Sequence, residues 1–161
     1  IGDTLTEGES VNFKGIPSFA PQIFRTIVNA DPQKEKQYHK GLNQLAEEGV
    51  VQIFSKLHQP NARVIGVVGQ LQLEVLQSRL ENEYGAACRY EPIDLSIAHW
   101  ITADDKKALR DFVDANSRRV LVDIRENFVF VSDSEWSLDR TRQNNPAIRF
   151  YSTSEMIDRR A

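Results

Sequence analysis

The order of its predicted strands and helices is the feature that most constrains how this chain folds. Between residues 22 and 97 the pattern reads strand, helix, strand, strand, helix, strand, which is the order of a split ferredoxin-like unit. The predicted strands are rich in β-branched and aromatic residues, and the helices carry apolar residues three and four positions apart. The same order recurs after residue 98. We therefore expect an α+β fold with two β-α-β-β-α-β halves.

Turn and capping residues mark the ends of the predicted elements in the first half. Asp31-Pro32 is typical of a helix start, with the aspartate as N-cap and the proline at the first helical position. Gly49 and Gly85 stand where left-handed C-caps are expected, and Gly69 precedes the second helix. Strands are predicted over 22–28, 50–57, 63–68 and 86–90, with a turn over 58–61. The residues expected on the buried helix faces are Tyr38, Leu42, Leu45, Leu73, Leu76 and Leu80.

The second half is shorter, and its helices are expected to begin at polar caps. Thr102 and Asp105 have the spacing of a capping box. Either Asp133 or Ser134 is expected to cap the last helix, which ends at 144–146. Strands are predicted over 120–124, 128–131 and 148–151. Periodicity does not reveal which strands pair between the two halves.

The first twenty residues have no helical periodicity. Glycines at 2, 8 and 15 and prolines at 17 and 21 keep them irregular, and the chain opens with isoleucine. We therefore expect a fragment of a longer protein, with residues 1–20 belonging to a preceding domain and linker. The halves are expected at 21–98 and 99–154, followed by a disordered tail at 155–161. Apolar residues that could contact either a preceding domain or the edge of this sheet are Val11, Phe13, Ile16 and Phe19.

Composition places the chain among ordinary globular proteins. Its 161 residues include 20 Lys and Arg against 23 Asp and Glu, a formal net charge of −3. A duplex-DNA binder usually shows a strong basic excess, and no apolar run approaches the roughly 20 residues that cross a bilayer. One cysteine, Cys88, excludes an internal disulfide framework and a multi-thiolate metal site. We expect a cytoplasmic protein without DNA or membrane partners.

The residues supply no set of groups that would make this chain an enzyme by itself. It has no G-x-x-x-x-G-K-[ST] loop, and Gly66-Val67-Val68-Gly69 lacks the third glycine of a dinucleotide-binding loop. His39, His58 and His99 do not have the spacing of metal ligands. Cys88 lies in an alternating strand and is expected to be a buried small hydrophobe. We predict no catalytic, cofactor-binding or metal-binding residues here.

Three basic clusters are candidates for contact with RNA phosphates. Arg and Lys position proteins on phosphates without reading the base sequence. Acidic residues are interspersed near these clusters, so a solvated surface of mixed charge is the alternative interpretation. Exposed aromatic residues for base stacking are not evident, since Phe128 and Phe130 alternate within an apolar strand. The candidate contacts are Lys34, Lys36, Lys40, Arg118, Arg119, Arg140 and Arg142.

Several segments, taken together, resemble the translational GTPases. Gly2-Asp3-Thr4-Leu5 resembles the end of their β-barrel second domain, and 42–49 (LNQLAEEG) resembles the L-x-x-L-x-E-E segment of the third domain of elongation factor G. Residues 66–75 (GVVGQLQLEV) resemble its G-x-G-E-L-H-L-E helix start. Here the chain departs from elongation factor G, because Gln70-Leu71-Gln72 replaces Glu, Leu and His.

The departures match instead the peptide chain release factor 3 family, the class II bacterial release factors. Residues 13–21 (FKGIPSFAP) and Gly69-Gln70-Leu71-Gln72 carry this resemblance. It continues through Trp100, 104–112 and 127–150, so it covers essentially the whole chain. Residues 1–20 then resemble the tail of the barrel domain, and 21–98 resemble the third domain of elongation factor G.

The resemblance implies a role in translation termination. The full protein of this family is a ribosome-dependent GTPase that promotes dissociation of class I release factors after peptide release. Its GTP and Mg²⁺ bind an N-terminal G domain, so no cofactor is expected in this chain. The implied partners are the ribosome (rRNA and small-subunit proteins), class I release factors indirectly, and the G and barrel domains in cis. We expect a non-catalytic C-terminal domain that docks on the small ribosomal subunit.

The alternative is a small-molecule-sensing regulatory domain, because such domains also use tandem β-α-β-β-α-β units. They generally have a permissive, often glycine-containing loop between the first strand and the first helix. The corresponding loop here is Asn29-Ala30-Asp31-Pro32, which is capped and has no glycine. This loop weakens the alternative.

Overall fold

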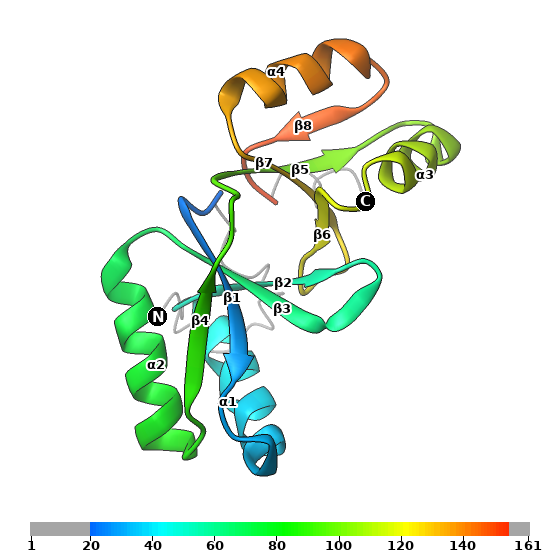
Figure 1. Ribbon diagram of the computed structural model, residues 1–161. Helices are drawn as coiled ribbons and strands as arrows, with labels where there is room; N and C mark the ends of the chain where they lie inside the picture. The colour runs from blue at the N-terminus through cyan, green and yellow to red at the C-terminus, as the bar shows by residue number, and fades with distance from the viewer. Residues whose placement is uncertain (1–19, 155–161) are drawn as a thin grey trace, which may run out of the picture.

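Eight antiparallel strands and four α-helices make up the part of the chain that the computed structural model describes, residues 20–154 (Figure 1). This arrangement confirms the predicted α+β class. Residues 1–19 and 155–161 lie outside the described residues, and so do the predictions of a barrel-domain tail and a disordered end. In chain order the elements are β1 (Ile23–Asn29), the 3₁₀ turn η1 (Pro32–Lys34), α1 (Glu35–Glu47), β2 (Gln52–Lys56), β3 (Gln59–Val67), α2 (Gln70–Tyr84), β4 (Cys88–Pro92), β5 (Ile97–Thr102), α3 (Lys106–Ala115), β6 (Val120–Val122), β7 (Phe128–Ser132), α4 (Glu135–Asn144) and β8 (Arg149–Tyr151).

The strand order shows how the two halves join. It runs β4-β1-β3-β2-β6-β7-β5-β8, so each half has the ferredoxin-like order and the halves meet at their second strands. β2 pairs antiparallel with β6 through Ser55 opposite Val122 and Lys56 opposite Leu121. The prediction of two β-α-β-β-α-β halves is confirmed. The pairing between them, which periodicity left open, is β2 with β6.

The two halves also pack against each other through the faces of their strands that carry no helices. On β2, Ile53 belongs to the core beneath α1 and α2, whereas its neighbour Phe54 belongs to a core shared with the other half. On β7, Phe130 lies in the core with α3 and α4, while Val129 and Val131 face the first half. Successive strand residues therefore enter different cores. The described part of the chain has three cores, and the middle one belongs to both halves.

Aromatic rings connect the halves within this middle core. The ring centroids of Phe24 and Phe54 lie 6.2 Å apart, and those of Phe54 and Trp100 lie 6.5 Å apart. Trp100 is completely buried, and its indole N–H donates a hydrogen bond to Asp123 Oδ2 at 2.9 Å. A buried tryptophan needs such a partner for its polar atom. The contact joins β1 and β2 of the first half to β5 of the second.

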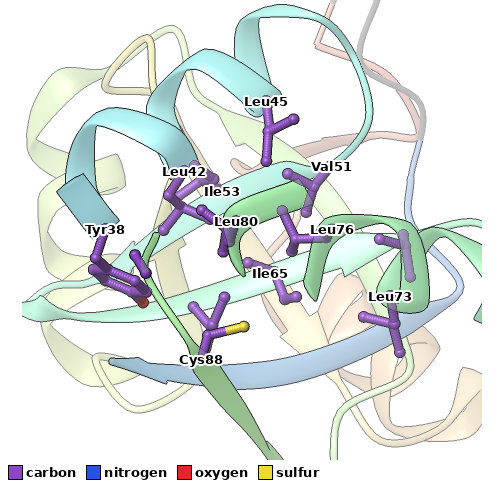
Figure 2. Packing of buried hydrophobic residues seen from close by; sticks show 13 residues of the cluster. Tyr38, Leu42, Leu45, Val51, Ile53, Ile65, Leu73, Leu76, Leu80 and Cys88 are labelled. Carbon is purple, nitrogen blue, oxygen red and sulfur yellow. The ribbon is translucent and has the colours of Figure 1, made fainter. Parts of the chain in front are cut away.

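Figure 2 shows the core beneath α1 and α2, where leucines from both helices point onto β2 and β3. The two helices approach closely at Gly41, where a Cβ atom would lie 2.7 Å from the ring of Tyr84. Cys88 is buried in the same core, as predicted, and this burial raises the pKa of its thiol. All of the helix residues predicted to be buried in this half are buried: Tyr38, Leu42, Leu45, Leu73, Leu76 and Leu80.

Most of the predicted helix ends are confirmed. Asp31 caps η1, and its side chain accepts a hydrogen bond from Gln33 N; the regular helix α1 begins only at Glu35. Gly49 and Gly85 have φ angles of 82° and 65°, the left-handed conformation expected after α1 and α2. Of the two candidate caps for α4, Ser134 is the one observed.

The predicted capping box at Thr102 is wrong. Asp105 itself is the N-cap of α3, and its side chain accepts a hydrogen bond from Lys107 N at 2.9 Å. Thr102 is held in an extended conformation as the last residue of β5, where it pairs with Arg149 of β8. Strand pairing therefore takes the threonine away from the helix start, and the nearer aspartate satisfies the free amides.

The predicted turn over 58–61 is also wrong. The turn between β2 and β3 consists of Leu57 and His58, and β3 already begins at Gln59. The pairing of Lys56 with Gln59 follows a shift in register after Ser55. Such an irregularity lets the ladder continue through residues whose types are typical of loops.

The middle core predicts that the two halves unfold together. Phe54→Ala removes the ring that contacts both Phe24 and Trp100, so the free energy of unfolding should fall by about 3–5 kcal/mol. Urea unfolding should remain a single transition by tryptophan fluorescence and by circular dichroism. The matched control is Trp136→Ala at a side chain 69% exposed, which should change stability by no more than about 0.5 kcal/mol. Two separate transitions in the Phe54 variant would contradict the shared core.

Candidate functional site

The seven predicted phosphate contacts are all exposed, but they lie in separate places. Lys34, Lys36 and Lys40 lie in η1 and α1, whereas Arg140 and Arg142 lie in α4 at the opposite end of the molecule (Figure 1). The remaining pair, 118–119, precedes β6 near the junction of the halves. No single surface therefore collects all seven.

The lysines on α1, like Arg118, have no side-chain partner in the described part of the chain. Lys36 and Lys40 are four residues apart and so lie on one face of the helix. Neither has an ion-pair partner within residues 20–154, because the nearby Glu35 carboxylate lies 3.6 Å from His39 Nε2 instead. Their ammonium groups are therefore free to meet phosphates of a partner.

The arginines near α4 are engaged with neighbouring side chains. Arg119 donates a hydrogen bond from Nη1 to Ser137 Oγ at 3.1 Å. The Arg140 guanidinium lies 5.3 Å from the centroid of the Trp136 ring, and that of Arg142 lies 5.5 Å from the Phe150 ring. These stacked arrangements hold the two guanidinium groups in place at the surface.

Trp136 shows that the interpretation of the aromatic residues was wrong in one respect. No exposed aromatic was evident from the sequence, yet the Trp136 side chain is 69% exposed while Leu138 is 1% exposed. Residues two positions apart on a helix face roughly opposite directions. A helix with Leu138 on its inner face would place Trp136 on its outer face, and this was the signal in the sequence that could have found the exposed ring. Phe130 is buried and Phe128 partly buried, as the sequence indicated.

The junction of the halves contains a groove that brings distant residues together, and we call it the seam groove. Its volume is about 460 Å³. Arg118 lines it together with Lys56 and His58, which lie some sixty positions earlier in the chain. Nothing in local spacing signals this arrangement. The lining residues are Lys56, Leu57, His58, Gln59, Ile93, Asp94, Leu95, Ser117, Arg118, Val120 and Leu121.

His99 is the histidine with the most unusual surroundings. It lies on β5, and its buried Nδ1 has no hydrogen-bond partner among the described residues. Burial lowers the pKa of its imidazole, and Arg142 lowers it further, while Glu135 acts in the opposite direction. Across residues 20–154, no three His, Cys, Asp or Glu side chains come together as a metal site would require.

The loop that a sensing domain would use is held by its own side chains. Asn29 Oδ1 accepts a hydrogen bond from Asp31 N at 3.1 Å, and Asp31 Oδ1 accepts one from Gln33 N at 3.0 Å. Both polar side chains of the loop thus stabilise the turn into α1. This local geometry gives the sensing alternative no support.

The fold defines the class of protein, a tandem ferredoxin-like domain whose two halves share one core. The family model for the class II release factor RF3, C-terminal domain, matches residues 13–142. This chain belongs to the class II release factor RF3 family. The resemblance found in the sequence is confirmed, and the chain has a role in translation termination, part of protein biosynthesis.

Within this family the C-terminal domain is a non-catalytic part of a translational GTPase. In the described part of the chain, none of the helices has the length and apolar character needed to cross a membrane.

The surroundings of His99 predict that stability depends on pH. Because the folded state lowers the pKa of His99, the unfolded chain binds more protons once the pH falls below the ordinary value of about 6.5. The free energy of unfolding should therefore decrease as the pH is lowered from about 7 to about 5. His99→Asn removes this contribution.

Urea unfolding of the original chain and of the His99→Asn variant, at pH values of about 7 and about 5, measures this change in the free energy of unfolding. The stability of the original chain relative to the His99→Asn variant should be greater at the higher pH. A difference that is the same at both values would contradict the lowered pKa.

Proposed function

We propose that this chain is the ribosome-docking module of a release factor of the RF3 family. It contacts the small ribosomal subunit during the GTP-dependent recycling of class I release factors in the cytoplasm. The match to the RF3 C-terminal domain over residues 13–142 carries the proposal. GTP and Mg²⁺ belong to a separate G domain, and this chain supplies binding surfaces in place of catalytic groups.

The shared core supports a docking role because it fixes the relative positions of exposed surfaces. Lys36 and Lys40 on α1 and Arg140 on α4 lie on opposite sides of the three cores. A module packed in this way keeps its contacts at constant separation. Docking can then affect the orientation of the G and barrel domains attached to it.

The lysines on α1 are the strongest candidates for phosphate contact. Exposed ammonium groups without carboxylate partners can replace the counterions of RNA, which favours binding at low salt. Lys34, Lys36 and Lys40 meet this description. Arg140 offers a second kind of contact, because a guanidinium stacked on the exposed Trp136 presents both a charge and a flat surface to an unpaired base. Arg118, Arg119 and Arg142 complete the proposed set.

Charge reversal at α1 tests the docking proposal. In the complete release factor, Lys36→Glu with Lys40→Glu should weaken ribosome binding and reduce the salt slope of log K by about 1 for each lost phosphate contact. The control is Lys106→Glu with Lys107→Glu on α3, which makes the same charge change at two other exposed lysines. That pair should leave the slope unchanged.

The two remaining clusters are tested in the same way. One variant reverses the charges of Arg118 and Arg119 together, and another reverses those of Arg140 and Arg142 together. A cluster whose reversal alters neither affinity nor slope is removed from the set. Equal effects of the α1 and α3 pairs would show only a general charge effect, and would contradict a specific contact at α1.

A further inference from the structure

We propose that the seam groove binds an extended acidic peptide segment with apolar side chains, contributed by a partner protein. The groove is open to solvent, and its volume of about 460 Å³ falls within the range of established binding pockets. This inference goes beyond ribosome docking and does not depend on it, because the groove shares only Arg118 with the proposed phosphate contacts, and its other lining residues are not among them.

The floor of the groove is made of aliphatic side chains from both halves. Leu57 comes from the turn between β2 and β3, and Ile93 and Leu95 come from the connection between β4 and β5. All three are only partly buried. Val120 and Leu121 of β6 also line the groove. Covering such a surface with leucine or phenylalanine side chains removes apolar area from water, which is the main favourable contribution to most protein–peptide contacts.

Cationic side chains outnumber acidic ones in the lining of the groove. Among the described residues, Lys56 and Arg118 are the cations of this lining and Asp94 is its acidic member, while His58 adds a further polar side chain. Neither Lys56 nor Arg118 has an ion-pair partner within the described part of the chain. The whole chain carries a formal net charge of −3, so this local excess of cations is not a consequence of composition. Charge complementarity therefore favours an acidic occupant.

The chemistry of the floor favours a peptide over RNA. Proteins recognise unpaired bases largely by stacking them on aromatic rings. Among residues 20–154, no Phe, Tyr or Trp lines the groove, and the exposed Trp136 belongs to α4 instead. Aliphatic side chains together with Lys56 and Arg118 suit a segment that combines apolar anchors with Asp or Glu.

The position of the groove gives its occupant a structural effect. Lys56 and Leu121 both line the groove, and they are also paired across the β2–β6 ladder that joins the halves. A bound segment would touch both halves beside this ladder. Because it would bind the folded chain and not the unfolded one, it should raise the melting temperature.

Selection from a displayed library of 12-residue random peptides, with the full chain as target, tests the proposal without assuming a sequence. The enriched peptides should combine Asp or Glu with Leu or Phe. Their affinities are then measured by fluorescence polarisation at several salt concentrations. Arg118→Glu should weaken binding by about tenfold or more, whereas Arg110→Glu, the same change at an exposed arginine of α3, should have less than about a twofold effect.

Both variants alter exposed side chains, and circular dichroism checks that they fold. A second variant, His58→Glu, adds a negative charge to the lining while Arg118 stays intact, and it should also weaken binding of the acidic peptide. The proposal is overturned if no enriched peptide responds to these two changes, or if the enriched peptides carry no acidic residues. It is also overturned if the groove variants abolish binding of a poly-uridine oligonucleotide or self-association in sedimentation, because RNA or a second copy would then be the occupant.

Discussion

The rest of this structure depends on the burial of the two helix-free sheet faces against each other, which the contact between Phe54 and Trp100 illustrates. In a ferredoxin-like half the helices cover one face of the sheet and leave the other without cover. Here the uncovered faces carry Phe24, Phe54 and Val64 on one side and Trp100 and Val129 on the other, each at most 1% exposed. Either half alone would present this apolar face to water. Each half therefore completes the core of the other.

This mutual burial also explains where binding surfaces can arise. The central strands β2, β3, β5 and β7 contribute residues to cores on both faces, so many of the residues free to meet a partner lie on the outer faces of the helices and at the margin between the halves. The lysines of α1 and the Trp136–Arg140 pair of α4 are surfaces of the first kind. The seam groove is of the second kind, because the halves meet there without filling the space between their connecting segments.

Periodicity was sufficient to predict the elements and their order, since the spacing of apolar residues and the positions of Asp31, Gly49 and Gly85 are local signals. Local signals failed where a distant strand decided the outcome. Thr102 was expected to cap a helix, but pairing with β8 holds it in β5. The β2–β6 pairing likewise depends on tertiary packing and leaves no mark on spacing. Runs such as Val129-Phe130-Val131, apolar at every position, did carry a signal for burial on both faces.

The functional surfaces were harder to predict than the fold. Charge clustering identified Arg118, but its neighbours Lys56 and His58 in the seam groove are separated from it by about sixty residues of sequence. The exposure of Trp136 follows from the burial of Leu138 two positions along the same helix. The role in translation termination came from resemblance to a family, which composition and periodicity alone would not have indicated.

Native-state hydrogen exchange tests the central claim, that the shared core makes the two halves one cooperative unit. The slowest amides of β3, such as Val64, and those of β5 and β7, such as Trp100 and Val129, should exchange through the same global opening. Their free energies of opening should agree and respond equally to added denaturant. If the amides of one half exchanged through a lower-energy opening while the other half stayed protected, the halves would be independent and the account would be contradicted.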